Sequence, residues 1–330
     1  MAKLPVGVIG VGHLGSLHAK MYAEITSAEL VGVLDNDGDR AAVVAKENNT
    51  TAYTSLEKLL ENVQAVSIAT PTSTHAEIAE KAIAKGVHVL LEKPITSTVE
   101  EAERIVALAK QKNVKIQVGH IERFNPALLA LEHYLINPMF IESHRLAQFN
   151  PRGTDVAVVL DLMIHDIDII LSLVHSPVEK IEANGVAVVS ENIDIANARL
   201  QFVNGCVANV TASSISQKKM RKMRMFQCDA YISIDFSDGS AEVFHLVDGN
   251  ETPAGNTMML GQIDSGKVKR NIVYEQPEIK NVNALKHELE MFIDAVQHGK
   301  TPLVTGEEGL RALQIAHQII KKIHQQKISL

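Results

Sequence analysis

A lysine follows an apolar, strand-like stretch in a position suited to chemistry. Residues 87–91 are apolar apart from one histidine and run directly into Glu92-Lys93-Pro94. If 87–91 is a strand of a parallel sheet, Lys93 lies at its carboxyl edge, where such sheets bind ligands. Partial burial there would suit a lysine to proton transfer, so Lys93 is a predicted catalytic residue. The alternative is an ordinary surface lysine on a loop.

A second group of ionisable residues lies in an apolar segment further along the chain. Asp161, His165 and Asp168 are spaced by four and three residues, which places them on one face of a helix. Histidine exchanges protons near neutral pH and a carboxylate can orient its ring, so His165 and Asp161 are predicted catalytic residues. A hydrogen-bonded polar cluster is one alternative. A metal site is the other, but no third or fourth ligand is evident, and we expect no metal.

Glycines near the amino terminus predict a nucleotide site. Gly10, Gly12 and Gly15 stand between a short apolar strand and a helical segment, the context in which this spacing is informative. Gly10 would permit a tight turn, Gly12 a close approach to a pyrophosphate, and Gly15 close packing of helix on strand. Backbone N–H groups of this helix, with His13 and Leu14 in its first turn, would hold the phosphates. The alternative is a tight turn without a ligand.

A carboxylate indicates which dinucleotide would bind. Asp35 ends the second predicted strand, where it can accept hydrogen bonds from the adenosine ribose. It would repel a 2′-phosphate, and Asn36 and Asp37 follow it instead of an arginine. The sequence therefore predicts NAD in preference to NADP.

The pattern of elements predicts two domains. Apolar strands alternate with helical segments up to about residue 122, which is typical of a parallel sheet covered on both faces. Beyond it, Asn204-Gly205 and Asp238-Gly239 predict hairpins of an antiparallel sheet, and residues 249–266 read as an exposed loop. We predict an α/β fold. Its parts are a doubly wound Rossmann domain over 1–122 and an α+β domain with an open, mainly antiparallel sheet over 123–330, for substrate binding and oligomerisation.

Composition excludes several classes of protein. The 330 residues are 46% hydrophobic and 22% charged, with a net charge of −7, which disfavours binding to nucleic acid or an anionic membrane. No apolar run is long enough to span a bilayer, and we find no signal peptide pattern. With only Cys206 and Cys228, no disulfide framework is expected. We expect a cytoplasmic protein.

Taken together, these motifs carry a resemblance to a known family. The glycine loop, Asp35, the Glu92-Lys93-Pro94 triplet and the Asp-x-x-x-His-x-x-Asp helix are accompanied by Thr70-Pro71 with His75, by Arg123-Phe124-Asn125-Pro126, and by Thr305 to Leu310. In this order they resemble the glucose-fructose oxidoreductase / inositol dehydrogenase / rhizopine catabolism family (Gfo/Idh/MocA) over nearly the whole chain. The resemblance implies a nicotinamide-dependent oxidoreductase that transfers hydride between a sugar or polyol carbon and NAD.

The resemblance also implies roles for particular residues. Lys93 would contact substrate and the nicotinamide ribose, His165 would be the acid/base, and Asp161 would accompany it. Pro94 would shape its loop, with a cis peptide bond as one way to do so. Thr70, Pro71 and His75 would line the cofactor, with Glu92 close to the nicotinamide. Thr72, Met163 and the segment 120–122 depart from the usual family pattern, which puts the substrate in doubt more than the chemistry.

The substrate is indicated by a narrower resemblance. Segments 119–126 and 162–168 look closest to the branch that acts on UDP-N-acetylglucosamine. A basic run could bind a diphosphate, or could be a solvated sheet edge; it comprises Lys218, Lys219, Arg221, Lys222 and Arg224. We expect substrate contacts from Arg123, Arg152, Asp168, Lys219 and Arg221. The alternatives are a dehydrogenase or reductase of a free polyol or sugar, a non-catalytic NAD-binding regulator, and a glycosidase-like use of tightly held NAD. A homodimer or homotetramer through the C-terminal sheet is expected, because such sheets leave an apolar face.

Overall fold

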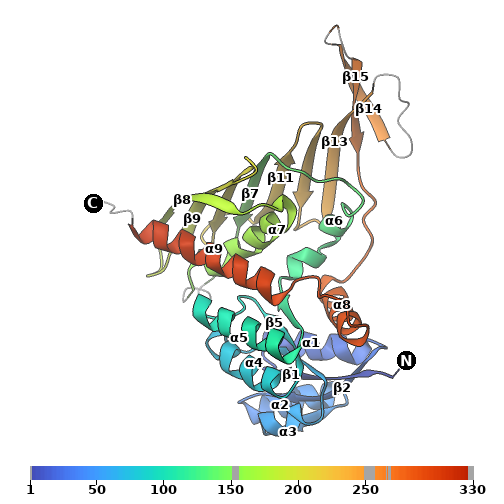
Figure 1. The fold of residues 1–330 in the computed structure, drawn as a ribbon, viewed down its shortest axis with the longest axis vertical. Helices are drawn as coiled ribbons and strands as arrows, with labels where there is room; N and C mark the ends of the chain where they lie inside the picture. Colours follow the sequence, from blue (N-terminus) through green and yellow to red (C-terminus); the bar gives the residue numbers. More distant parts are fainter. Residues whose placement is uncertain (1, 151–155, 249–256, 265, 267–268, 326–330) are drawn as a thin grey trace. The chain divides into compact units, whose positions relative to one another are not determined.

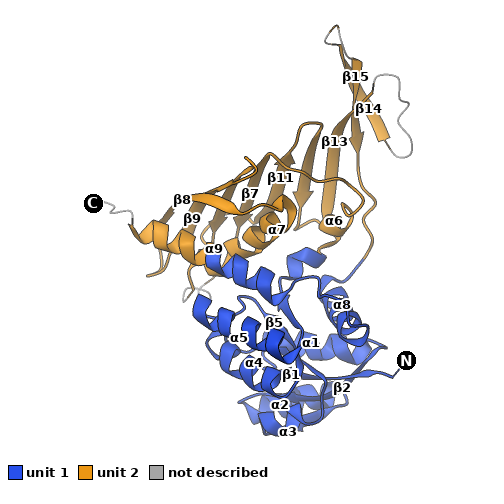
Figure 2. Ribbon diagram, viewed as in Figure 1, with its two compact units in different colours: residues 1–124, 282–314 blue, residues 125–281, 315–330 orange. Residues whose placement is uncertain are grey.

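The computed structural model describes the chain apart from residues 1, 151–155, 249–256, 265, 267–268 and 326–330 (Figure 1). It divides into two compact units, each described here by itself (Figure 2). Unit 1 contains residues 1–124 and 282–314, and unit 2 contains residues 125–281 and 315–330. The division at residue 122 into a cofactor region and a substrate region stays a prediction. No helix in the described part of the chain is both long and apolar enough to cross a membrane.

Unit 1 is built on a parallel sheet, as the sequence predicted. Among the described residues its six strands lie in the order β3-β2-β1-β4-β5-β6. The strands are β1 (Leu4–Ile9), β2 (Ala28–Leu34), β3 (Thr51–Tyr53), β4 (Ala65–Ile68), β5 (His88–Glu92) and β6 (Ile116–Gly119). The strand order reverses between β1 and β4, which is where doubly wound sheets bind their ligands.

Helices connect these strands. They are α1 (His13–Glu24), α2 (Gly38–Glu47), α3 (Leu56–Leu60), η1 (Thr72–Thr74), α4 (His75–Ala84), α5 (Val99–Lys112) and η2 (Ile121–Phe124). Helix α5 begins with a capping box in which Thr98 and Glu101 exchange hydrogen bonds, and it ends at Asn113 in the left-handed conformation. The alternation of strand and helix that the sequence showed is therefore confirmed.

The C-terminal part of the chain returns to unit 1. Helix α8 (Ala284–Gln297) places Leu289, Phe292 and Ile293 in the same buried core as β1 and α1. Helix α9 (Gly306–Gln325) begins with a capping box, since the Thr305 and Glu308 side chains each accept a hydrogen bond from the other residue's backbone N–H. The packing of α8 against β1 and α1 makes the segment 282–314 part of unit 1.

Unit 2 is built on a mainly antiparallel sheet. Its nine strands, counted within the described residues, lie in the order β14-β15-β13-β12-β11-β7-β10-β9-β8, and only β7 and β10 pair in parallel. The strands are β7 (Phe140–Leu146), β8 (Val178–Val186), β9 (Ile195–Phe202), β10 (Val207–Ser213), β11 (Met220–Phe226), β12 (Ala230–Asp235), β13 (Ser240–Asp248), β14 (Thr257–Asp264) and β15 (Lys269–Glu275). Both predicted hairpins are confirmed, with Gly205 and Gly239 at positive φ.

One prediction for this unit is wrong. Residues 257–264, expected within an exposed loop, form strand β14, which pairs with β15. The predicted loop 249–266 is rich in Gly, Asn, Asp and Thr as a whole, but pairing with β15 supplies residues 257–264 with the backbone hydrogen bonds that a loop would lack. Residues 249–256 lie outside the described part of the chain.

The sheet of unit 2 has two different faces. Along β10, Ala208, Val210 and Ala212 are buried, whereas Asn209 and Thr211 between them are partly exposed. The short helix α6 (Pro126–Leu129), the π-helical turn η4 (Val159–Met163) and helix α7 (Ile164–Val174) also belong to this unit. Helix α7 contacts β7 and β10 (Figure 1). We call the face that carries the buried side chains the covered face, and the other the open face.

Candidate active site

The glycine loop lies between β1 and α1, as predicted. Gly10 has a φ of +81°, which favours glycine, and a Cβ atom there would come within 2.6 Å of the Thr70 methyl group. A Cβ atom on Gly15 would overlap the carbonyl oxygen of Gly10. A Cβ atom on Gly12, by contrast, would meet no atom within 4 Å. The space next to the Cα atom of Gly12 is therefore free of protein atoms, and a pyrophosphate can approach the backbone closely there.

Helix α1 begins in a way that suits an anion. Gly12 is its N-cap residue and no side chain caps the helix; its first turn contains no acidic residue. Its first N–H groups can therefore donate to a phosphate. The first turn contains His13 and Leu14, and Leu14 is 49% exposed although it is apolar.

Asp35 holds the glycine loop beside the end of β2. Its Oδ2 accepts a hydrogen bond from the Val11 N–H at 2.8 Å, and its Oδ1 accepts one from the Asp37 N–H at 2.9 Å. Arg40, on α2, lies 3.5 Å from the same Oδ1. Each carboxylate oxygen keeps acceptor capacity for a ribose hydroxyl. Sequence reasoning missed Arg40, because we examined only the residues that directly follow Asp35.

The loop after β4 carries the next predicted cofactor residues. Thr70 and Pro71 precede η1, and His75 begins α4. The His75 ring is buried and lies between two backbone carbonyl oxygens, 2.9 Å from that of Thr70 and 3.1 Å from that of Pro94. Burial lowers the pKa of His75 despite these hydrogen bonds, so the ring is neutral and its single N–H serves one carbonyl at a time. His75 thereby ties the β4 loop to the β5 loop.

Glu92, Lys93 and Pro94 follow at the carboxyl end of β5. The Lys93–Pro94 peptide bond is cis, which confirms the expectation for Pro94. Glu92 Oε1 lies 3.0 Å from Nε2 of His18, a fully buried residue of α1, and its Oε2 accepts a hydrogen bond from the Lys93 N–H. A Cβ atom on Gly119 would come within 3.0 Å of the Glu92 carboxyl group. Glycine on the neighbouring strand therefore makes room for this carboxylate.

The electrostatics of this loop are set by burial and by paired charges. Burial would raise the pKa of Glu92, but the hydrogen bond and charge of His18 and the charge of Lys93 outweigh it and hold the pKa below its usual value. Burial lowers the pKa of His120 to about 3, aided by the positive charges of Lys93 and Arg123. His120 is therefore neutral at physiological pH.

All the predicted cofactor residues thus lie in unit 1. They follow β1, β2, β4 or β5, whose carboxyl ends meet at one edge of the parallel sheet. The predicted residues are Gly10, Gly12, His13, Leu14, Gly15, Asp35, Thr70, Pro71, His75, Glu92 and Lys93.

The predicted acid/base group lies in unit 2 on a helix that changes its pitch. Asp161 belongs to the π-helical turn η4, and His165 lies in the first turn of α7. The uniform α-helical spacing expected between Asp161 and His165 is therefore interrupted, as is frequent at functional sites. Both are partly exposed, whereas Asp168 is 3% exposed.

A buried ion pair anchors this helix to the sheet. Arg145 of β7 donates from Nε and Nη2 to Oδ1 of Asp166, at 3.1 and 2.7 Å, and both side chains are almost fully buried. The sequence did not predict this ion pair. Little in the sequence indicates that Arg145 is buried, since β7 mixes charged and apolar residues.

The predicted substrate residues are spread over both units. Arg123, in unit 1, forms an ion pair with Glu308 at 2.9 Å and connects η2 to α9. Lys219 lies just before β11 in unit 2 and Arg221 is the second residue of that strand. Both side chains are exposed. Arg152 lies outside the described residues. Among the described residues, no group of three or more His, Cys, Asp or Glu side chains could hold a metal ion.

Comparison with known proteins now identifies the family. A model described as an oxidoreductase family with an NAD-binding Rossmann fold matches residues 4–120. Its companion, the C-terminal alpha/beta domain of the same oxidoreductase family, matches residues 145–330. The chain belongs to the Gfo/Idh/MocA family of oxidoreductases.

Individual relatives agree with this assignment. UDP-N-acetylglucosamine 3-dehydrogenase of Acidithiobacillus ferrooxidans is 39% identical over 320 residues, which are 97% of each chain. A solved structure of that enzyme matches with a TM-score of 0.86 and 37% identity over 98% of both chains. Myo-inositol 2-dehydrogenase of Thermotoga maritima is 25% identical over 98% of this chain and 97% of its own.

Membership of the Gfo/Idh/MocA family confirms the predicted enzyme class. The chain is a nicotinamide-dependent oxidoreductase with an NAD-binding Rossmann domain. The loops of unit 1 fit the cofactor on structural grounds, through the uncapped start of α1 and the open space at Gly12. Sequence reasoning missed His18 and Glu288 in this unit, because each lies within an apolar helical pattern far along the chain from Glu92.

Proposed function

We propose that the protein oxidises a ring hydroxyl of a UDP-linked N-acetylamino sugar, with UDP-N-acetylglucosamine as the first candidate, and uses NAD+ as the hydride acceptor. The observation that carries the proposal is the 39% identity to UDP-N-acetylglucosamine 3-dehydrogenase over 97% of each chain. Inositol dehydrogenases are more distant, at 25% identity for the Thermotoga maritima enzyme.

The placement of the basic run supports a nucleotide-sugar substrate. Lys222 pairs with Asp235 at 3.0 Å and Arg224 lies 3.6 Å from Glu142 on the open face of the sheet. Arg221 alternates with these residues, so it lies on the covered face, where α7 contacts the sheet. We assign the diphosphate of the substrate to Arg221 and Lys219, because cationic side chains bind phosphate through charge-assisted hydrogen bonds.

The chemistry requires removal of a proton and a hydride from the same alcohol. The bound cofactor would accept the hydride. In our proposal one of the two residues, His165 or Lys93, takes the hydroxyl proton and the other stabilises negative charge on the oxygen. Asp161 would orient His165. Asp35 and the start of α1 would hold the ribose and the pyrophosphate, and Glu92 would lie beside the nicotinamide.

The test is NADH formation from NAD+ over a panel of substrates. We expect turnover with UDP-N-acetylglucosamine and little with free hexoses or inositols. Lys93→Ala and His165→Ala should each reduce kcat by roughly a hundredfold or more. Lys110→Ala and His133→Ala, at exposed positions in the same two units, are the matched controls. Turnover confined to free polyols would overturn the substrate, and near-normal turnover in both active-site variants would overturn the residue roles.

The same proposal includes the assembly and location of the enzyme. The open face of the sheet in unit 2 carries a row of aromatic side chains, each 4.9–5.9 Å from the next between ring centroids. The row comprises Phe140, Phe226, Tyr231, Phe244 and Tyr274. We propose that a second copy of the chain covers this face. We place the enzyme in the cytoplasm, where NAD is supplied.

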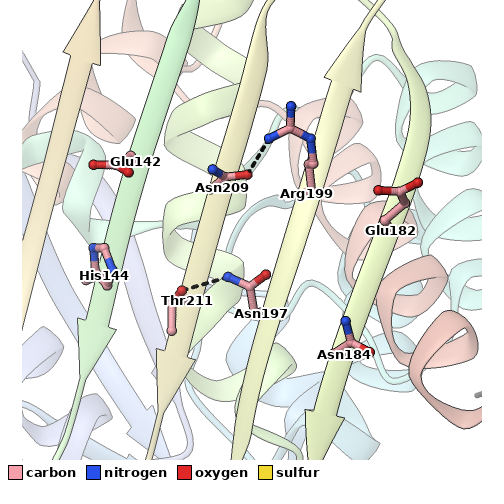
Figure 3. A pocket seen from close by; sticks show the side chains of 8 residues that line it. All are labelled: Glu142, His144, Glu182, Asn184, Asn197, Arg199, Asn209 and Thr211. Carbon is pink, nitrogen blue, oxygen red and sulfur yellow. Dashed lines mark hydrogen bonds between the residues drawn. The ribbon is translucent and has the colours of Figure 1, made fainter.

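The rest of the open face is polar. The expected contact between copies of the chain therefore does not rest on a wholly apolar face. On β7 to β10 it presents a pocket with carboxylates at Glu142 and Glu182 and a guanidinium at Arg199 (Figure 3). Asn209 accepts a hydrogen bond from Arg199 at 3.0 Å across neighbouring strands. The sequence predicted an apolar face, whereas the structure has an aromatic part and a polar part with charges of both signs. A face of this kind can pair with its own copy about a two-fold axis.

A further inference from the structure

A carboxyl group without a hydrogen-bond partner lies in the interior of unit 1. Glu288, on α8, is 0% exposed. Neither of its side-chain oxygens has a hydrogen-bond partner among the described residues. Buried polar groups are normally hydrogen-bonded, and a buried charge normally has a partner. Packing alone therefore gives no reason for a carboxyl group at this position.

The side chains around Glu288 include the predicted nicotinamide residue. The charge of Glu92 acts on Glu288, so the two carboxyl groups interact. Glu92 in turn lies 3.0 Å from Nε2 of His18, whose Nδ1 is buried without a partner among the described residues. The Gln117 side-chain amide donates to the backbone oxygen of Glu288 at 3.1 Å, while its own Oε1 is likewise buried and unpartnered in the part of the chain that is described. These residues form one buried group, which we call the Glu288 cluster: His18, Glu92, Gln117 and Glu288.

Further charged groups surround the cluster on every element that packs against it. Helix α1 contributes His18 and Tyr22, and the Tyr22 hydroxyl interacts electrostatically with Glu288. The remaining titratable or charged side chains are Lys93 after β5, His120, Glu122 and Arg123 at and before η2, and Glu308 of α9 against Arg123. The positive charge of Lys93 acts on Glu92 and on His120, and that of Arg123 acts on His120, while no cation is hydrogen-bonded to Glu288 among the described residues.

Two buried carboxyl groups that interact cannot both be ionised at low cost. Burial and the charge of Glu92 raise the pKa of Glu288 well above its usual value. Glu92 is held in the ionised form by His18 and Lys93. Burial and these charges therefore favour the proton on Glu288 and the negative charge on Glu92.

We propose that Glu288 is a positioning residue that acts through Glu92 and gives its proton to solvent when a positive charge binds beside Glu92. The inference rests on the proposed function, in which Glu92 lies beside the nicotinamide. Oxidised nicotinamide carries a positive charge that the reduced ring lacks. Binding of NAD+ then favours the carboxylate of Glu288 and releases a proton, whereas binding of NADH does not. The cluster thereby favours the oxidised cofactor, the form needed for alcohol oxidation.

The test is calorimetric titration of NAD+ and of NADH into the protein at about pH 8, in two buffers with different enthalpies of ionisation. For the wild type, we expect the enthalpy of NAD+ binding to differ between buffers in the direction of proton release, and that of NADH binding to be the same in both. Glu288→Gln should abolish the buffer dependence. It should also raise the ratio of the NAD+ to the NADH dissociation constant by about fivefold or more. Glu290→Gln, at an exposed position of the same helix, is the matched control and should behave as wild type.

The outcomes separate this inference from the proposed function. NAD+ binding without proton release in the wild type, or proton release that persists in Glu288→Gln, overturns the inference and leaves the NAD site in place. If neither cofactor binds to the wild type, the proposed function fails and the inference fails with it.

A measurement on the protein without cofactor tests the proton on Glu288 itself. The unfolded state loses this proton near the usual pKa of a glutamate, whereas the folded state keeps it to higher pH. Wild-type stability should therefore fall relative to Glu288→Gln as pH rises from about 4.5 toward the raised pKa. Thermal unfolding at a series of pH values checks this. A difference in Tm that does not vary with pH would mean that Glu288 is already ionised in the folded protein, and would overturn the inference.

Discussion

Two glycines of the cofactor loop have different neighbours and should respond differently to substitution. A Cβ atom on Gly12 meets nothing within 4 Å, whereas one on Gly15 overlaps the Gly10 carbonyl. We expect Gly12→Ala to cost about 1 kcal/mol or less in stability, the usual difference between these residues at an N-cap. It should weaken NAD+ binding by about tenfold or more, because the methyl group fills the space of the pyrophosphate.

Gly15→Ala is the contrasting variant, since it should destabilise the protein even without cofactor. Chemical unfolding and NAD+ titration of both variants separate the two roles. Unchanged NAD+ affinity in Gly12→Ala would contradict the placement of the pyrophosphate.

Asp35 and its neighbours should determine the choice of dinucleotide. The double variant Asp35→Ser/Asn36→Arg removes the carboxylate and adds a guanidinium that can pair with a 2′-phosphate. Arg40 would also lose one of its two anionic neighbours, Asp35 at 3.5 Å, while it keeps its ion pair with Asp37 at 3.0 Å. We expect the ratio of kcat/KM for NADP+ to that for NAD+ to rise by about tenfold or more. An unchanged ratio would contradict the role of Asp35, and Asp39→Ser, in the same segment, is the control.

Single residues were predictable where their chemistry is tied to a local pattern. Gly10 and Lys93 were found because each follows a recognisable strand, whereas the cis bond at Pro94 was expected, as one way to shape its loop, from the resemblance to the family. His18 and Glu288 were not found, since their importance arises from contact with Glu92 across a distance of many residues in sequence. A buried carboxyl group in a helix has no sequence signature that distinguishes it from an exposed one.

At the scale of elements, a buried ion pair joins α7 to β7 in unit 2. Asp166 is buried and its partner is Arg145, at 2.7 Å. Arg145→Met would leave a buried, uncompensated carboxylate, and we expect it to lower the free energy of unfolding by about 3–5 kcal/mol. Arg145→Met/Asp166→Leu removes both charges and should recover most of that loss.

The free energy of unfolding is measured in urea for the wild type, for Arg145→Met, for Asp166→Leu and for the double variant. These four values form a complete thermodynamic cycle. Equal destabilisation by Arg145→Met alone and by the double variant would mean that the ion pair has no special role. Glu182→Leu, a carboxylate on the open face of the same sheet, is the control and should have a small effect.

Helices and strands were predicted correctly where apolar residues recur at the spacing of a helix or form a buried run, and were missed where they do not. The strands of unit 1 are short, buried runs, and their alternation with helices gave the correct fold. Strand β7 (Phe140–Leu146) was missed because two of its inward-facing residues, Ser143 and Arg145, are polar. Strand β14 (Thr257–Asp264) was missed because almost all of its side chains are exposed, so that pairing with β15 and not burial defines it. The π-helical turn η4 has no sequence signal known to us.

At the scale of the whole molecule, the open face of the unit 2 sheet raises the question of assembly. Its aromatic row ends near β14, where Met258, Met259 and Leu260 are each more than half exposed. A monomer would leave this apolar surface in water, at a cost that increases with its area. The polar part beside it supplies charges of both signs, so a second copy turned by a two-fold axis can satisfy both parts at once.

Phe226→Glu should therefore dissociate the assembly. Phe226 lies within the row, between Phe140 and Tyr231, and is 38% exposed in a single chain. A carboxylate there would be buried without a partner in the interface, whereas it would be solvated in a monomer. We expect sedimentation velocity to show a dimer or tetramer for the wild type and a monomer for the variant. Phe149→Glu, at a 51% exposed phenylalanine outside the row, is the matched control. A monomeric wild type, or a Phe226→Glu variant that assembles as tightly as the control, would show that this face is not the contact between copies.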